Sequence, residues 1–214
     1  MSITVQSFSV TFAGQPVSTP VHKSVATPER TVLFSDAVFA IVITILVLDL
    51  RPPESASATA LLSLWPRALS YAVSYFFLAI VWMNHHYLLR HARLASPRLL
   101  WSNFAHLFAV SLVPFATAWI AGTSLAGTPV ALYALIFVLV NVTYLMLCWE
   151  VIDRPSGERL SPRVRRMLHM RSFATLAVFI AAAIVALAFP LAGMFLICAC
   201  LVLYLRPEAP GKAA

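Results

Sequence analysis

Arg30, Ser35 and Asp36 bring a cation, a hydroxyl and a carboxylate to the start of a long apolar segment, AVFAIVITILVLDL. An aspartate at the centre of a membrane helix costs about 3 kcal/mol, so such a group usually has a polar partner or a function. A carboxylate beside a hydroxyl can move a proton, attract a cation or fix a helix against its neighbours. No histidine on this segment could activate Ser35, and no carboxylate pair has a working spacing, so we expect no enzymatic activity.

Groups that could pair with Asp36 lie near the end of the second apolar segment: Trp82, Asn84, His85 and His86. Indole, amide and imidazole N–H groups can all donate to a carboxylate. Both clusters lie near the same membrane face, so a contact between them is geometrically possible. Alternatively, the histidines only occupy the membrane interface. The sequence does not decide which of His85 and His86 would reach the carboxylate.

The histidines and cysteines do not suggest a metal site. Neighbouring residues of a helix point about 100° apart, so His85 and His86 cannot bind one tetrahedral ion by themselves. The 3 cysteines all fall in apolar segments, where cysteine packs as a small hydrophobic side chain. We therefore predict no metal and no cofactor.

The first apolar segment also carries a stripe of large apolar side chains. At about 100° per residue, one face of a helix collects Phe34, Val38, Ile41, Ile45 and Leu48. Thr44 lies beside this stripe, and Asp36 projects to the opposite side. Such a stripe most often contacts lipid or another helix, but rings of it in an oligomer could form a hydrophobic gate that excludes water. Periodicity does not choose between these readings.

The elements that position these residues are predicted to be membrane helices. Hydrophobic residues make up 61% of the chain and charged residues only 11%, whereas about a quarter of a soluble domain is charged. Six apolar segments follow one another, at about 30–50, 61–89 (or 66–89), 99–121, 130–152, 173–189 and 191–205. The last would reach only about 22 Å at 1.5 Å per residue and so would just span a bilayer. We predict an all-α, polytopic membrane protein with six transmembrane helices.

The positive residues predict the orientation of these helices. Nearly all Lys and Arg fall in alternate loops on one side, leaving Arg51 and Arg67 on the other. The positive side normally faces the cytoplasm, so we expect both termini to be cytoplasmic in a cell (inner) membrane. The net charge of +7 then reflects topology, and no basic stripe interleaved with aromatic residues suggests nucleic-acid binding. The basic stretch 153–171 is expected to be an irregular or short amphipathic connection on the headgroups.

We divide the chain into a disordered tail, 1–27, a six-helix membrane domain, 28–206, and a C-terminal tail, 207–214. The tail at 1–27 is rich in Ser, Thr and Pro, and Thr27-Pro28-Glu29 has the residue types that begin a helix. In the third segment, Pro114 is expected to produce a kink, and Asn103 is expected to bond to another helix.

The spacing R-x-x-x-F-S-D at 30–36, followed by A-V-F-A-I-V-I-T-I-L-V-L-D, resembles the first helix of the prokaryotic transmembrane-protein-175 potassium channels. Trp82 with His85 or His86, Asn103, and Pro114-Phe115-x-Thr117 match as well. The resemblance covers about 30–205, and its specific part is the first-helix motif.

This resemblance implies a potassium-permeable cation channel, a homotetramer in which the first helix of each subunit lines a central pore. It implies no P-loop filter, and the chain has no T-V-G-Y-G. Ile41, Ile45 and Leu48 match the apolar layers that constrict the pore, and Thr44 matches a threonine implicated in a modest preference for K⁺ over Na⁺. The polar cluster that would hold the first helix comprises Arg30, Phe34, Ser35, Asp36, Trp82, Asn84, His85 and His86. The expected partners are monovalent cations, membrane lipid and other copies of the chain.

Two other readings remain open. A small proton-coupled secondary transporter could use Asp36 with His85 or His86 as its titrating pair. Such transporters often contain internal repeats, and no repeat is evident here. A non-conducting accessory membrane protein would use the apolar stripe for packing alone.

Overall fold

The computed structural model describes residues 28–53, 55–92, 94–153 and 162–204. The predicted tails, 1–27 and 207–214, lie outside the described residues. All regular elements within the described ranges are helices: α1 (Pro28–Leu48), α2 (Ala58–Ser63), α3 (Trp65–Leu89), α4 (Pro97–Ser111), α5 (Val113–Gly122), α6 (Gly127–Cys148), η1 (Trp149–Asp153), α7 (Pro162–Ala188) and α8 (Pro190–Tyr204). The predicted all-α fold class is confirmed.

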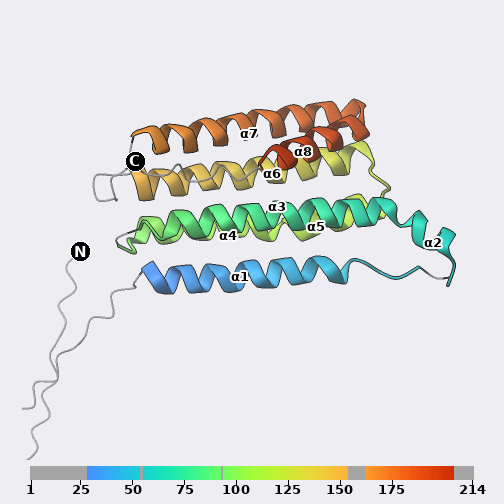
Figure 1. Cartoon of the computed structure of the whole chain (residues 1–214), viewed down its shortest axis with the longest axis horizontal. Helices are drawn as coiled ribbons and strands as arrows, with labels where there is room; N and C mark the ends of the chain where they lie inside the picture. Colours follow the sequence, from blue (N-terminus) through green and yellow to red (C-terminus); the bar gives the residue numbers. More distant parts are fainter. Residues whose placement is uncertain (1–27, 54, 93, 154–161, 205–214) are drawn as a thin grey trace, which may run out of the picture.

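The long helices lie side by side in a bundle (Figure 1). Five described spans are long and apolar enough to cross a membrane: α1, α3, α4 with α5, α6 with η1, and most of α7. The sixth predicted segment is the shorter apolar helix α8, which has 15 residues. The chain is therefore a multi-pass membrane protein.

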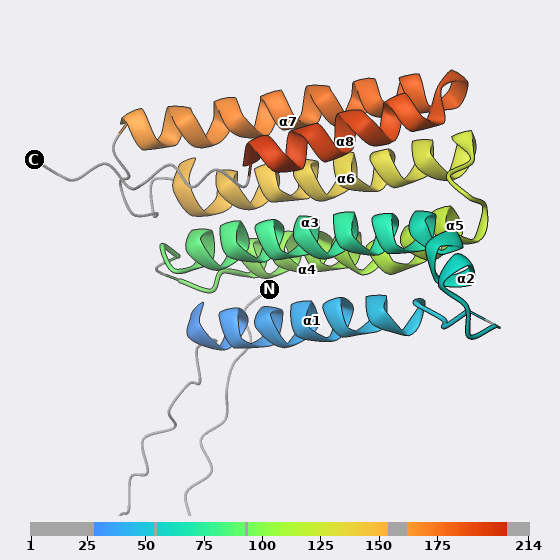
Figure 2. The same cartoon turned by 45° about the vertical axis from the view of Figure 1, so that its right-hand side comes forward.

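Helix α1 lies at one edge of the bundle and α7 with α8 at the other (Figures 1 and 2). α1 packs on α3, α4 and α5, whereas α7 packs on α6 and α8. The core between them includes three aromatic rings: Phe77 stacks on Phe137 with ring centroids 3.5 Å apart, and Phe179 is edge-on to both. This arrangement leaves one side of α1 without a neighbour from the described part of its own chain.

The third predicted segment is interrupted where we expected it. Proline has no N–H to continue a helix, and α4 ends at Ser111, just before Pro114 at the start of α5. In the first turns of α5, just after this break, Thr117 donates to the carbonyl of Val113 at 2.8 Å and shares a hydrogen bond with Ser74 at 2.6 Å. Side chains thus tie the broken helix to α3.

The prediction that 153–171 forms an irregular or short amphipathic connection is wrong for its second half, because the long helix α7 already begins at Pro162. Residues 154–161 lie outside the described residues. The first turns of α7 are held by Asp153 at the end of η1. The Asp153 carboxylate pairs with Arg165 and lies 3.2 Å from His169 Nε2. The Asp153 side chain is only 3% exposed, so the Arg165 guanidinium and the imidazole of His169 on α7 offset the cost of burying a carboxylate.

Glycine permits the close packing of α8 on α7. A Cβ at Gly193 would lie 2.6 Å from Ala186 Cβ and 2.9 Å from its Cα. These distances are shorter than any normal carbon contact, so only glycine fits there. Small residues at helix contacts serve this purpose in membranes, where hydrophobic burial does not drive helices together.

Candidate functional site

One face of α1 is buried against the rest of the chain. It carries Thr31, Ser35, Phe39, Val42 and Leu46, which recur every three or four residues as one helical stripe requires. Ser35 and Leu46 are completely buried, and Phe39 is 1% exposed. The rotation of α1 about its own axis is therefore fixed by these contacts with α3, α4 and α5.

The opposite face of α1 is exposed. At about 100° per residue, Thr44 lies diametrically opposite Ser35, and Thr44 is exposed. Of the predicted stripe, Leu48 is 75% exposed, Ile41 58% and Ile45 41%. The three predicted gate residues and the predicted selectivity residue thus share the side of α1 that the described residues leave uncovered.

The other two stripe residues lie at the border between the two faces. Val38 is partly buried and packs against the core. Phe34 makes an edge contact with Phe104 of α4, with ring centroids 5.7 Å apart. The stripe deduced from periodicity is therefore offset from the exposed face of α1. The helical period gives the angles between side chains, but it does not say which side of the helix packs against the rest of the chain.

Asp36 lies on the flank of α1 and contacts α3. The indole Nε1 of Trp82 donates to Asp36 Oδ1 at 2.8 Å. His86 Nδ1 lies 3.5 Å from Oδ2 of the same carboxylate. These groups are partly exposed, with 29% of the Asp36 side chain accessible. The structure thus brings together the carboxylate and two of its predicted partners, and the histidine involved is His86.

Ser35 belongs to a separate, buried network. Asn103 Nδ2 on α4 donates to Ser35 Oγ at 3.0 Å, and Asn103 Oδ1 lies 2.7 Å from His85 Nε2 on α3. All three side chains are at most 1% exposed. Asn103 therefore joins α1 to α3 through one amide group, which is the interhelical role expected for it.

His106 extends this network and was not singled out from the sequence. Its ring stacks on His85, with centroids 5.4 Å apart and planes 6° apart, and its Nδ1 lies 3.0 Å from Thr143 Oγ1 on α6. A lone histidine in an apolar segment gives no periodic signal. Its position three residues after Asn103, on the same helical face, is the clue that could have revealed it.

The predicted polar cluster is thus two groups rather than one, and three of its members stand apart. Arg30 is exposed in the first turn of α1, and Phe34 packs against the ring of Phe104 on α4. Asn84 lies on another side of α3, where it lines a cavity with α6, α7 and α8. Successive residues of a helix point in different directions, so closeness in sequence did not bring these side chains together.

Replacing Asp36 by asparagine should weaken the attachment of α1 moderately. The amide oxygen can still accept from Trp82, but the negative charge facing His86 is lost, so we expect about 1 kcal/mol less stability. Thermal unfolding and size-exclusion chromatography in detergent measure the effect. Glu29→Gln, an exposed carboxylate changed in the same way, is the control. An Asp36→Asn protein as stable and as well assembled as the control would contradict this role.

The family model described as endosomal/lysosomal potassium channel TMEM175 matches residues 30–114. A potassium channel of Chryseobacterium sp. (strain P1-3) is 37% identical over 145 residues, 68% of this chain and 74% of that protein. A potassium channel of Streptomyces collinus is 32% identical over 143 residues, 63% of this chain and 68% of that protein.

The fold has a solved counterpart. The crystal structure of a lysosomal potassium-selective channel TMEM175 homolog from Chamaesiphon minutus superposes with a TM-score of 0.75. The match covers 85% of this chain and 98% of that chain at 24% sequence identity, which supports the fold alone. Together with the sequence relatives and the match that begins at Arg30, these findings establish that the chain belongs to the TMEM175 family of potassium channels.

Proposed function

We propose that this chain forms a homotetrameric, potassium-permeable cation channel in the cell (inner) membrane, with both termini in the cytoplasm. The observation that carries the proposal is the division of α1 into two faces. Its buried face and polar anchors attach it to α3 and α4, while the face with Ile41, Thr44 and Leu48 has no partner within the described chain. Four copies assembled around α1 would bring these faces together on a common axis.

The proposed gate consists of rings of Ile41, Ile45 and Leu48. A narrow ring of aliphatic side chains offers a hydrated cation no ligand, so water leaves it and conduction stops. Movement of the four helices apart would admit water and let cations pass. The buried Ser35–Asn103–His85 network, together with Asp36 and its two partners, would keep each α1 at a fixed rotation during this movement.

Thr44 is the proposed selectivity residue. Its hydroxyl donates to the Ile41 carbonyl at 2.8 Å, which leaves the lone pairs of the oxygen free for another contact. Four such oxygens could replace part of the hydration shell of a cation. A ring of single hydroxyls is a weaker cage than stacked carbonyl groups, so the preference for K⁺ over Na⁺ should be modest.

The basic test of the channel function is potassium efflux from liposomes that contain the purified protein. A channel gives passive efflux that does not saturate with the potassium gradient. The 3.5 Å approach of His86 to Asp36 favours, as a second candidate, a proton-coupled transporter that uses this pair. Efflux that saturates and requires a proton gradient would support the transporter, and absence of efflux from a defined tetramer would leave an accessory role.

Replacing Thr44 by valine should reduce the selectivity while sparing conduction. Valine has the same shape but no oxygen, so we expect the K⁺/Na⁺ permeability ratio to fall about two- to threefold, equivalent to about 0.5 kcal/mol. Reversal potentials in planar bilayers measure the ratio. Thr44→Ser keeps the hydroxyl and should retain it. Equal ratios in the valine and serine variants would remove Thr44 from the selectivity site.

A further inference from the structure

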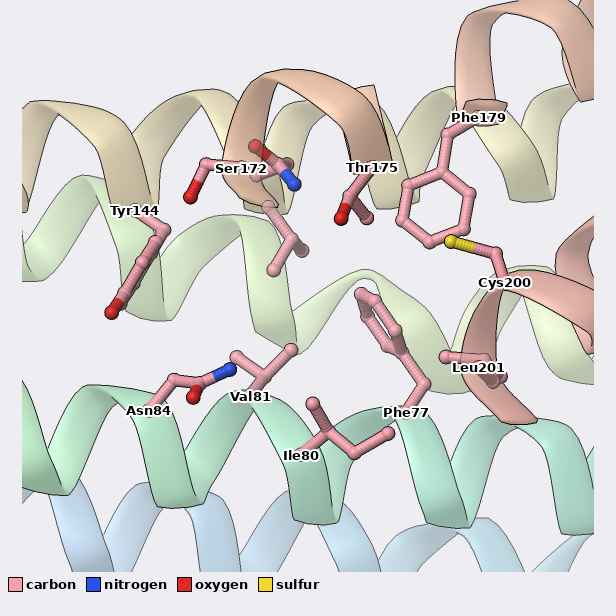
Figure 3. A pocket seen from close by; sticks show the side chains of 12 residues that line it. Phe77, Ile80, Val81, Asn84, Tyr144, Ser172, Thr175, Phe179, Cys200 and Leu201 are labelled. Carbon is pink, nitrogen blue, oxygen red and sulfur yellow. The ribbon is translucent and has the colours of Figure 1, made fainter. Parts of the chain in front are cut away.

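The hollows of the described bundle differ in the room that they leave for a ligand. Phe77, Phe179 and their neighbours fill most of the space between α3, α6, α7 and α8 (Figure 3), and the volume left to water there is only about 40 Å³. This is room for a few water molecules. A cleft at the end of the bundle that carries α2 is far larger, with about 690 Å³ open to water. Its volume is in the range of small-ligand sites.

Two arginines line this cleft, Arg51 and Arg67. They are the two positive residues that the sequence leaves on the side opposite the others. Arg51 follows the end of α1, where Pro52 prevents the helix from continuing. Arg67 lies in the first turn of α3, next to Pro66, which fits there because the first turn of a helix needs no N–H. Two separate segments of the chain thus bring their positive charges to one cleft.

The described residues do not balance this positive charge. None of those that line the cleft is acidic, and neither guanidinium pairs with a described carboxylate. Arg51 is exposed and Arg67 is partly exposed, so both can contact a ligand in the cleft. Two like charges at one surface repel each other, and a bound anion would remove this repulsion.

Hydroxyl groups add further donors to the lining, which includes Ser55, Ser63 and Ser124. Ser124 belongs to the turn after α5 and has a φ of 50°, and Leu125 follows with a φ of 64°. Positive φ is unfavourable for leucine, but the Leu125 side chain is only 4% exposed and its burial holds the turn. The turn thus keeps Ser124 at the wall of the cleft.

We propose that this cleft binds a phosphate group, either of a phospholipid headgroup or of free phosphate. Each guanidinium can donate two parallel hydrogen bonds to a pair of phosphate oxygens. A tetrahedral phosphate offers oxygens to Arg51, Arg67 and a serine hydroxyl at the same time, whereas a carboxylate has only two oxygens. Binding at this site does not depend on whether the protein conducts potassium.

The experiment uses the full chain in dodecyl maltoside, a detergent without phosphate, after ³¹P NMR has shown that no phospholipid remains bound. Isothermal titration calorimetry then measures the binding of inorganic phosphate and, separately, of dihexanoyl-phosphatidylglycerol. We expect saturable binding of at least one probe. Tighter binding of the lipid identifies a headgroup as the ligand, and tighter or equal binding of inorganic phosphate identifies the free anion. Saturable binding of neither probe would overturn the proposal.

Variants of the two arginines test the assigned contacts. Arg51→Gln and Arg67→Gln should each weaken the binding about tenfold. Arg67→Lys should lose less, because lysine keeps the charge without the two-pronged donor. Arg163→Gln, at an exposed position in the first turn of α7, should bind like the wild type. Wild-type affinity in the double variant Arg51→Gln/Arg67→Gln would overturn the proposal.

Glu54 provides a separate test, because it lies in sequence between Pro53 and Ser55 of the lining and outside the described residues. Its carboxylate could compete with a phosphate for the same arginines. We expect Glu54→Gln to raise the affinity by no more than about threefold, as for the loss of an exposed charge. Probe binding that appears only in Glu54→Gln would show that the chain neutralises its own arginines, and would overturn the proposal.

Discussion

Ile41→Asn is expected to raise potassium efflux from proteoliposomes at least about tenfold. A free-energy barrier to permeation that is lower by about 1.4 kcal/mol is enough for a tenfold increase in rate. Ile41 is 58% exposed on the free face of α1, which is the exposed face opposite the one that packs on α3, α4 and α5. In a tetramer, the substitution would place four amides where four aliphatic side chains exclude water. The amides would keep the constriction wet and supply oxygens to a passing cation, so the closed gate would leak.

The matched control is Ile184→Asn. Ile184 is 66% exposed on α7, at the edge of the bundle away from α1, so the same chemical change there should leave the efflux at the wild-type level. Efflux that stays unchanged in well-assembled Ile41→Asn protein would remove this residue from the gate. Equal increases in both variants would point to a general weakening of the protein.

Asn103→Leu is expected to cause the largest loss of stability, about 2–4 kcal/mol. Leucine has the same branched arrangement of side-chain heavy atoms as asparagine, but it would leave Ser35 Oγ and His85 Nε2 buried without the partner that now joins them. Because these groups lie inside a membrane bundle, no water replaces the lost amide. α1 should detach more readily from α3 and α4, and tetramer formation should fail with it.

Thermal unfolding in detergent and the fraction of assembled protein measure this loss. Asn84→Leu is the control, because Asn84 is also on a membrane helix but lies outside the network. Its effect on unfolding should be much smaller. An Asn103→Leu protein that unfolds at the control temperature would mean that the buried network contributes little to the position of α1.

The contact between Asp36 and the second membrane segment could be foreseen from residue types. A carboxylate and several N–H donors near one membrane face have few other partners. The choice between His85 and His86 could not be foreseen, because these residues point about 100° apart and only the rotation of α3 decides. That rotation depends on the packing of α3 against its neighbours along its whole length.

The start of α7 was missed for a different reason. Hydropathy reports how far a helix is immersed in lipid, and the arginines at 163–171 indicate only that this stretch leaves the hydrocarbon. The helix continues into the polar region, because Asp153 of η1 holds Arg165 and His169 there. Contacts between segments that are distant in sequence decide such boundaries.

The most direct test of the central proposal, that the free face of α1 lines the conduction path, is chemical modification of Leu48→Cys during potassium efflux. Leu48 is 75% exposed near the end of α1. A positively charged methanethiosulfonate reagent should attach a ring of cations there and reduce the efflux to the protein-free background. Wild-type protein, with Cys148, Cys198 and Cys200, and Ile184→Cys should be unaffected. Complete modification of Leu48→Cys with unchanged efflux would contradict a pore lined by α1.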